Sequence, residues 1–428
     1  MEEKTKHLIV ISFDGISTKD FDYIKELNNF KSILKEASFS AKVYSVYPTL
    51  TYPAHTTIIT GKNPVNHGII NNTLLQPKRK SPDWYWNRKY IKSETIYDLA
   101  SKHDMKVAAL MWPVTAKANI KYNMPEIFAN RPWHNQILVS LLNGSKYFQY
   151  SMNKKYGKLR KGLKQPYLDN FTHKVLLDTI INKQLNLILV HYTDLDATRH
   201  MYGFEAKETK EALVRHDIRL GEIIQTLKKE GIYEESTIII LGDHSSLDED
   251  KVININVLFK DKGYLIFDKK GRVKSYRAIA KSCDGSSYIY FKDNSVDFSQ
   301  EVKKVLEEFN LKNNCIEEIY NGASAGKLGA DINCGFMLEA RKGYYFLDDI
   351  EGEVIKDVSS SSEFTKSTHG YSPYKKDYTT IFIAAGKGIK KGVQLEEMNL
   401  VDEGPTIGKL LGLDLKDIDG RVIEEFMK

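Results

Sequence analysis

The sequence contains few cysteines and no long apolar run. Cys283, Cys315 and Cys334 are the only cysteines in 428 residues, and their spacing does not resemble a thiolate metal site. A sparse, odd set of this kind argues against a disulfide framework and indicates a reducing compartment. No run approaches the roughly 20 apolar residues that cross a bilayer, and the N-terminal apolar run is too short for a secretory signal. These absences predict a cytoplasmic protein with no membrane partner.

The chain also lacks a strong excess of charge. It has 62 Lys and Arg against 56 Asp and Glu, which gives a net charge of +6. This balance favours anionic partners slightly and does not indicate specific binding of nucleic acid. An apolar content of 42% with 28% charged residues is typical of a folded globular protein. The length suits one α/β core with an insertion, and the sequence carries no prediction of oligomeric state.

Apolar runs that alternate with amphipathic segments predict the fold class. The predicted strands are residues 8–13, 106–111, 187–192, 237–241 and 379–384. The predicted helices between them include residues 21–34, 93–102, 172–181 and 205–229. Strands and helices in alternation form βαβ units, so we predict an α/β fold with a doubly wound, mostly parallel sheet and helices on both faces. In such sheets, ligands bind beyond the carboxyl ends of the strands.

The alternation of predicted strands and helices changes between residues 253 and 364. Residues 286–291 predict a strand and residues 299–310 a helix, and residues 331–340 and 342–348 predict a hairpin pair. This mixture indicates an inserted, smaller α+β cap. We therefore predict a catalytic core made of residues 1–252 and 365–428, interrupted by a cap made of residues 253–364.

Carboxylate, imidazole and hydroxyl side chains follow the predicted strands or lie in loops. The candidates are Asp14, Thr51, Asp196, His200, Asp243, His244 and His369. Taken singly, each has an ordinary explanation, such as capping of a helix by Asp14 or Thr51. Taken together, oxygen and nitrogen ligands without thiolates suit zinc, with manganese or iron as alternatives. Seven ligands suit two divalent ions, which can clamp the entering and leaving oxygens of a displacement at phosphorus.

Five short segments carry these residues in order along the chain. They are FDG (13–15), PTLTYPAHTTIITGKNPVNHGIINN (48–72), DLDATRH (194–200), GDH (242–244) and THGY (368–371). The set resembles the alkaline phosphatase superfamily, and in particular its nucleotide pyrophosphatase/phosphodiesterase (type I phosphodiesterase) branch. The resemblance spans nearly the whole chain. It implies the superfamily's fold and its two-metal hydrolysis of phosphate esters.

The resemblance also implies roles for the candidate residues. It implies two zinc sites, one formed by Asp196, His200 and His369 and the other by Asp14, Asp243 and His244. Thr51 would complete the second site and act as the nucleophile, because it occupies the hydroxyl position of the Pro-Thr-x-Thr-aromatic-Pro motif. Asn72 would donate to a phosphoryl oxygen, assisted by the backbone N–H of Tyr52 at a helix N-terminus. The ring of Tyr52 would stack on the base or aryl group of the substrate.

The substrate class follows from the charges near Thr51. A monoester carries an extra negative charge that an arginine commonly neutralises, and no arginine lies between Thr51 and Asn72. We therefore predict hydrolysis of phosphodiester or phosphoanhydride bonds in a small anionic substrate, such as a nucleotide. The alternatives are a phosphonate C–P hydrolase or a phosphomonoesterase, with Lys327 or Arg341 of the cap as extra clamps.

Some features leave other interpretations open. Leu50, His191 and Ser245 depart from the residues usual in the branch, which puts nucleotide preference in question. Arg199 could reach an anionic substrate or pair with a surface acid. The basic residues 154–164 predict a solvated surface. A different class of function would be a non-catalytic module that binds anionic polymers through this segment.

Overall fold

A central sheet organises the computed structural model, which describes residues 4–292 and 295–428. Among these residues the sheet has nine strands. Their bounds are β1 His7–Phe13, β2 Ala37–Tyr44, β3 Val107–Leu110, β4 Tyr122–Met124, β5 Leu187–Tyr192, β6 Ser236–Leu241, β18 Thr380–Gly386, β19 Gln394–Leu395 and β20 Met398–Asn399. The spatial order is β19-β2-β18-β6-β1-β5-β3-β4, with β20 beside β2. Only β18 runs antiparallel to its neighbours, so the prediction of a mostly parallel sheet is confirmed.

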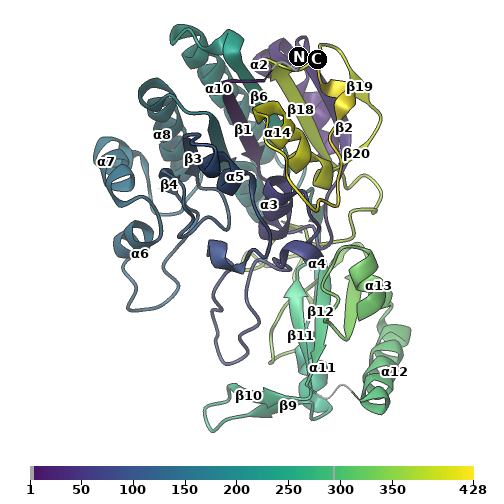
Figure 1. Ribbon diagram of the computed structural model, residues 1–428. Coiled ribbons are helices and arrows are strands. Elements are labelled where there is room, and N and C mark those ends of the chain that lie inside the picture. Colours follow the sequence, from purple (N-terminus) through teal and green to yellow (C-terminus); the bar gives the residue numbers. More distant parts are fainter. Residues whose placement is uncertain (1–3, 293–294) are drawn as a thin grey trace.

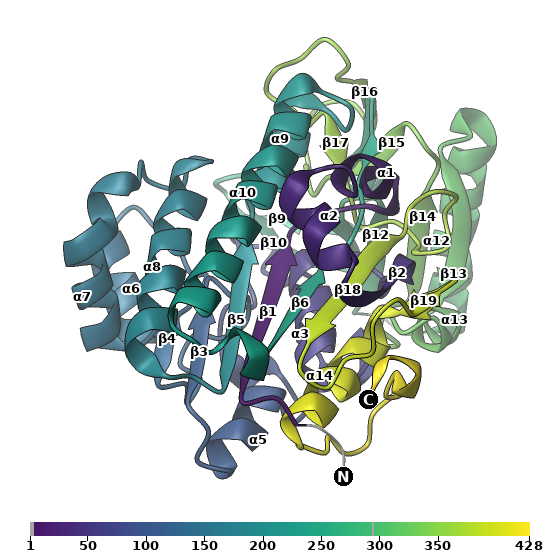
Figure 2. The ribbon, with the colours of Figure 1, turned by 90° about the horizontal axis from the view of Figure 1, so that it is seen from above.

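Helices cover both faces of this sheet (Figure 2). One face carries α3 (Thr51–Thr60), α5 (Ile96–Lys102) and α14 (Glu403–Leu411), and the other carries α2 (Asn28–Leu34), α8 (Tyr167–Lys183) and α10 (Lys207–Lys229). Alternate residues of β1 serve the two layers, because Leu8 and Val10 pack with the first set and Ile9 and Ile11 with the second. The strand is apolar throughout since both of its faces are buried. The doubly wound architecture is therefore confirmed.

A second sheet builds the smaller lobe seen at the bottom of Figure 1. Its strands are β11 (Ala278–Cys283), β12 (Ser286–Phe291), β14 (Phe336–Ala340) and β13 (Ile316–Asn321), in that antiparallel order. The helix α12 (Val296–Asn313) packs on it through Phe298, Val302 and Leu306, within a hydrophobic cluster separate from the two core layers. The lobe lies within residues 253–364, but the division of the chain at those boundaries stays a prediction.

One predicted pairing in this region is wrong. Residues 331–340 and 342–348 were expected to form a hairpin pair, and the structure forms β14 and β15 (Tyr344–Phe346) there. However, β15 pairs in parallel with β8 (Lys251–Ile253), which also pairs with β16 (Ile355–Asp357). Two adjacent apolar runs look like a hairpin in sequence, while the partner of β15 lies about ninety residues upstream and only tertiary packing selects it.

The remaining elements connect these layers. They are α1 Phe21–Ile24, α4 Pro64–His67, α6 Gln136–Asn143, α7 Lys146–Tyr156, α9 Asp194–Tyr202, α11 Ile255–Asp261, α13 Gly322–Lys327, β7 Leu247–Asp248, β9 Leu265–Phe267, β10 Val273–Tyr276 and β17 Ser367–Thr368, with short 3-10 turns between some of them. In the described part of the chain, no helix combines the length and the apolar character needed to cross a bilayer.

Candidate active site

The ends of three neighbouring strands place most of the candidate residues. Asp14 directly follows β1, and Asp243 and His244 come two and three residues after β6. Helix α9 begins shortly after β5 and carries Asp196 and His200 one turn apart. Because β5, β1 and β6 are adjacent and parallel, their carboxyl ends meet at one edge of the sheet. The structure therefore brings together residues that lie up to 230 positions apart.

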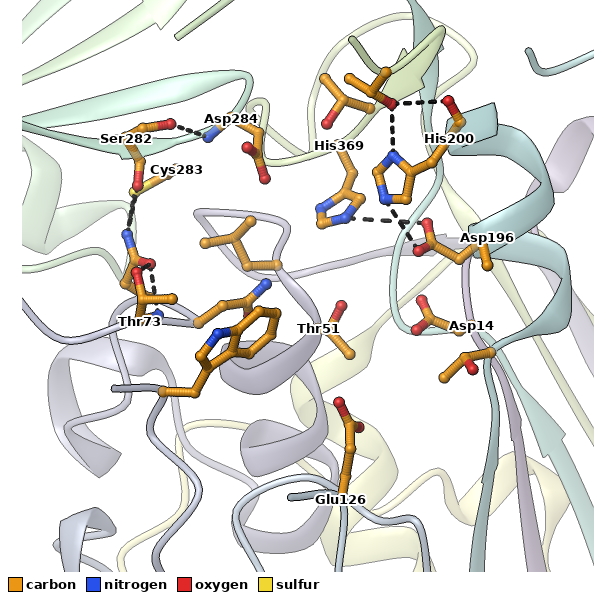
Figure 3. Close-up of a pocket in the computed structure, with 18 of the residues that line it drawn as sticks. Asp14, Thr51, Thr73, Glu126, Asp196, His200, Ser282, Cys283, Asp284 and His369 are labelled. Atoms are coloured by element: carbon orange, nitrogen blue, oxygen red, sulfur yellow. Dashed lines mark hydrogen bonds and ion pairs between the residues drawn. The ribbon is translucent and has the colours of Figure 1, made fainter. Parts of the chain in front are cut away.

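The candidate ligands form two compact groups. Figure 3 shows Asp196, His200 and His369 of one group, with Asp14 of the other group and Thr51 beside them. In one group, His200 Nε2 lies 3.1 Å from Asp196 Oδ2, and His369 Nε2 lies 4.0 Å from Asp196 Oδ1. His369 reaches this group from the loop after β17. The ligand atoms of the group lie within 4.8 Å of one another, which is a spacing that one metal ion can bridge.

The second group is fully buried. His244 Nε2 lies 3.3 Å from Asp14 Oδ1 and 3.2 Å from Asp243 Oδ2. Thr51 Oγ1 lies 3.2 Å from the same nitrogen of His244. The rings of His244 and His369 stack with centroids 3.8 Å apart, so the two groups adjoin. All seven predicted metal-site residues therefore meet in one region of the molecule.

The electrostatics of the two groups fit divalent cations. Asp14 Oδ1, Asp196 Oδ1 and Asp243 Oδ2 are buried and accept no hydrogen bond from any described residue. Burial and the neighbouring Asp243 and Asp196 carboxylates raise the pKa of Asp14 well above its usual value, and burial raises the pKa of Asp243 to about 6. Carboxylates packed this closely repel one another unless a positive charge lies between them. The donor set therefore suits two metal ions.

Hydrogen bonds orient the histidines so that Nε2 faces the groups. His200 Nδ1 lies 2.7 Å from the backbone carbonyl of Ser367, and His369 Nδ1 lies 3.1 Å from that of Thr49. A proton held on Nδ1 by a carbonyl leaves the lone pair of Nε2 for a metal ion. Burial opposes the charged form of His200, but the Asp196 carboxylate raises its pKa to about 9. A metal ion at Nε2 would take the place of that proton.

Thr51 and Asn72 meet at the N-terminus of α3. Thr51 is the first residue of the helix. The backbone N–H of Tyr52 donates to Asn72 Oδ1 at 2.9 Å. This bond fixes the side-chain amide of Asn72, which lines the cavity, and leaves its NH₂ group to donate to a ligand. The predicted donor role of the Tyr52 N–H needs correction, because Asn72 already accepts its proton.

The prediction for the Tyr52 ring is not supported by its position. The ring is fully buried beneath Trp84, with centroids 5.2 Å apart, and its hydroxyl donates to Glu126 at 3.3 Å. A buried ring presents no face to a substrate. Trp84 and Phe128 line the cavity instead. The sequence motif identified an aromatic next to Thr51, but the chain from residue 73 onward covers it, and a local motif carries no sign of that cover.

His191 and Glu126 support Asp14 from behind, a role that the sequence did not predict for either residue. His191 Nε2 lies 3.0 Å from Asp14 Oδ2, and its Nδ1 lies 3.3 Å from Glu126 Oε2. Burial opposes protonation of His191, but the hydrogen bond to Asp14 and the nearby Glu126 carboxylate raise its pKa well above the usual value. Glu126 follows the edge strand β4 and belongs to no motif, so nothing in the sequence marks it. His191, which differs from the residue usual in the branch, thus lies behind Asp14, a predicted metal ligand.

A cavity of about 790 Å³ opens over the two groups. The core supplies Trp84 and Phe128, and the smaller lobe supplies Lys281, Asp284 and Asp348. Lys327 and Arg341, the clamps considered for a monoester or phosphonate, are not among the residues that line it.

The alternatives for Arg199 are also resolved by its contacts. Its guanidinium is fully buried and donates to Asp20 at 2.6 Å and to the carbonyl of Gly15. It also lies over the ring of Phe204. Arg199 therefore holds the loop after β1 against α9 and does not reach the cavity.

Similarity to known proteins identifies the family. The family model of type I phosphodiesterase / nucleotide pyrophosphatase matches residues 8–372. The chain belongs to this family. Membership confirms the superfamily resemblance and the predicted enzyme class, a metal-dependent hydrolase acting on phosphate esters, of a family that uses two divalent metal ions.

Relatives of the family match over most of their length. Human bis(5'-adenosyl)-triphosphatase ENPP4 is 22% identical over 427 residues, which cover 95% of this chain and 78% of that protein. The structure of murine ectonucleotide pyrophosphatase/phosphodiesterase 5 matches with a TM-score of 0.70 and 20% identity, covering 99% of this chain and 100% of that one. An inactive threonine-to-alanine variant of the murine protein in complex with AMP matches with a TM-score of 0.68, at 20% identity and full coverage of both chains. These likenesses confirm the alkaline-phosphatase-like fold.

Proposed function

We propose that this family member hydrolyses phosphodiester and phosphoanhydride bonds of small nucleotide substrates through a phosphothreonine intermediate on Thr51. The observation that carries the proposal is the position of the Thr51 hydroxyl. It lies at the first residue of α3, 3.2 Å from His244 Nε2 and at the edge of the cavity. A hydroxyl in this place can attack a phosphorus atom held over the helix N-terminus.

The metal-site residues, Thr51 and Asn72 have different roles in the proposed reaction. We propose zinc as the metal, held by Asp196, His200 and His369 and by Asp14, Asp243 and His244 with Thr51. When bound, the ions supply positive charge that favours the ionised forms of the Thr51 hydroxyl and of a water molecule. Thr51 Oγ1 attacks phosphorus in line, the ester or phosphate group opposite departs, and water then releases the phosphoryl group from Thr51. The NH₂ group of Asn72 donates to a non-bridging phosphoryl oxygen throughout.

The charges of the cavity favour a diester over a monoester. Among the described residues that line the cavity, Lys281 is the only lysine or arginine, and its amine pairs with Asp348 at 2.5 Å. Among these lining residues, no unpaired lysine or arginine is left to neutralise the second charge of a monoester. A nucleoside suits the cavity because Trp84 and Phe128 offer aromatic surface on the core side. The names of the relatives, with their adenosine-containing ligands, support the same substrate class.

Kinetics of one substrate pair test this proposal. With zinc-loaded enzyme, a nitrophenyl phosphodiester should turn over faster than the corresponding monoester. Thr51→Ala should lower turnover of the diester at least about a thousandfold, and Thr51→Ser should retain part of it because a hydroxyl remains. Faster hydrolysis of the monoester, or unchanged activity of Thr51→Ala, would reject the proposal, and the second result would favour the non-catalytic module instead. Metal analysis of the purified protein decides between zinc and manganese.

The cytoplasm stays the proposed compartment. All three cysteines are free and buried, as a reducing environment would leave them. The names of the relatives describe ectoenzymes, so a location outside the cytoplasm is the alternative. Fractionation of cells that express the full chain, with activity measured in each fraction, separates the two.

A further inference from the structure

An apolar surface on α6 and α7 is left uncovered by the rest of the described chain. Helix α6 contains five aliphatic residues out of eight, and none of its residues is buried. Leu138 and Leu142 are 58% and 62% exposed. Trp133, three residues before α6, is 78% exposed, and Tyr147 on α7 is 86% exposed. Isolated exposed apolar residues are ordinary, but several of them gathered on two helices in contact with each other point to a docking surface.

The same surface is strongly basic. Residues 127–168 contain eight lysines and arginines and no aspartate or glutamate. Lys155 pairs with Asp178 and Arg131 with Asp83, both outside the segment. Over residues 4–292 and 295–428, no carboxylate forms an ion pair with the exposed Lys146, Lys154, Lys158, Lys161 and Lys164. The surface thus combines exposed apolar side chains with lysines whose charge no carboxylate of the described residues neutralises.

The position of this surface links it to the active-site cavity. A small apolar pocket lies between α6 and α7, and it shares Met111, Ile127, Leu163 and Leu168 with the wall of the cavity. In Figure 1, α6 and α7 lie together at one edge of the molecule, away from the smaller lobe. A partner that covers them would therefore sit beside the mouth of the cavity and leave the lobe free.

We propose that α6, α7 and the basic residues that follow dock the enzyme on the surface of an anionic lipid bilayer. Trp133, Leu138 and Leu142 would enter the boundary between headgroups and acyl chains, while the lysines contact lipid phosphates. The helix would lie on the bilayer and not cross it. The prediction of no membrane partner, which rested on the lack of a spanning run, is revised by this proposal.

The chemistry of the surface distinguishes a bilayer from other occupants. A nucleic acid would match the lysines, but it stacks on aromatic faces and offers nothing to the aliphatic side chains of α6. A second copy of the chain would bring two acid-free basic segments against each other, and like charges at an interface repel. An anionic bilayer satisfies both features, because it presents negative phosphates outside and hydrocarbon beneath them.

Vesicle binding of the full-length, metal-loaded protein tests the proposal. Vesicles of phosphatidylcholine with phosphatidylglycerol should bind the protein at least about tenfold more tightly than vesicles of phosphatidylcholine alone, since each lysine near the surface adds to the attraction. Raised salt should weaken the binding. Fluorescence of Trp133 should shift to shorter wavelength when vesicles are added, and Trp133→Phe should remove that shift.

Matched variants distinguish vesicle binding through this surface from nonspecific adsorption of the protein to vesicles. Leu138→Glu with Leu142→Glu should lower binding to the anionic vesicles about tenfold or more. Leu311→Glu is the control, because Leu311 is 90% exposed on α12, far along the chain in the other lobe. Both variants should keep their hydrolysis of a soluble diester, since these side chains lie outside the active site. The vesicle assay needs no turnover, so it stands apart from the catalytic proposal.

Three results would overturn the proposal. The first is equal binding to neutral and anionic vesicles, and the second is anionic binding that the double variant on α6 leaves unchanged. The third is dimerisation in solution that the same variant abolishes, which would assign the surface to a second copy of the chain. Sedimentation velocity at the protein concentration of the vesicle assay measures that last outcome.

Discussion

The side chain of Asn72 acts through one fixed amide group. Its oxygen accepts the N–H of Tyr52, so only its NH₂ group can meet a phosphoryl oxygen. Asn72→Ala should lower kcat/KM for a diester about a hundredfold, as removal of one oxyanion donor does elsewhere. Asn72→Asp should lower it further, because a carboxylate can still hold Tyr52 but repels the phosphoryl group. Metal content measured on both variants serves as the control, and near-normal activity of Asn72→Asp would contradict the role.

Glu403 predicts a pH dependence of stability. It is the first residue of α14, and both its carboxyl oxygens are buried without a hydrogen bond from any described residue. Burial raises its pKa well above the usual value. Above about pH 4.3 this carboxyl ionises in the unfolded chain, so folding must take up a proton. The stability of the wild type therefore falls as pH rises, until the pH reaches the raised pKa of the folded state.

The variant Glu403→Gln removes this proton uptake. From pH 5 to pH 8, the free energy of unfolding of the variant minus that of the wild type should increase by up to about 1.4 kcal/mol per pH unit. Urea unfolding of both proteins across this range measures the difference, in which other titrating groups cancel. Parallel curves would show that Glu403 has the same pKa in the folded and unfolded states.

At the scale of elements, a glycine lies at one of the contacts between the smaller lobe and the core. Gly370 follows His369 with a φ of +88°, and a Cβ there would lie 1.7 Å from the carbonyl oxygen of Cys283, at the end of β11. The N–H of Gly285 also donates to the carbonyl of His369 at 2.7 Å. The turn between β11 and β12 therefore presses directly on the loop that carries a predicted metal ligand.

Gly370→Ala should separate these two elements. We expect a loss of about 1–3 kcal/mol in the free energy of unfolding and a loss of metal from the group that contains His369. Gly343→Ala is a matched control, because Gly343 also has a positive φ, of +92°, but no atom lies within 4 Å of its added Cβ. Thermal unfolding and metal analysis measure both effects. Equal effects of the two variants would assign the loss to backbone strain alone.

Elements differ in how well local sequence predicts them. The strands β1, β5 and β6 are continuous apolar runs because both faces of each are buried, and they were predicted to within a residue or two. The parallel partner of β15 was not predictable, since β8 is three residues long and lies far upstream. The strands β2 and β4 also escaped prediction. Strand β4 lies at the sheet edge and β2 lies beside the two-residue strands β19 and β20, so neither is a continuous buried apolar run.

For the whole molecule, metal binding should contribute to folding as well as catalysis. The site buries Asp14 and Asp243 side by side, and their mutual repulsion opposes folding when no cation is present. An ion that binds only the folded state, at a thousand times its Kd, stabilises it by about 4 kcal/mol. Chelation should therefore lower the Tm, and added zinc should restore it. Thr51→Ala, measured beside the wild type, should respond in the same direction although it is inactive, because the carboxylates and histidines of both groups remain. A Tm that chelation leaves unchanged would contradict a buried metal site.

The sequence by itself determined the family, the sheet and the set of residues that meet at its edge. The carboxyl ends of adjacent parallel strands lie at one edge of the sheet, and short motifs place polar residues directly after those strands. Tertiary structure alone decided which aromatic faces the cavity, why His191 and Glu126 stand behind Asp14, and that α6 stays uncovered. The physical reason is that burial of a side chain depends on segments distant in sequence, whereas strand periodicity and motif spacing are local properties of the chain.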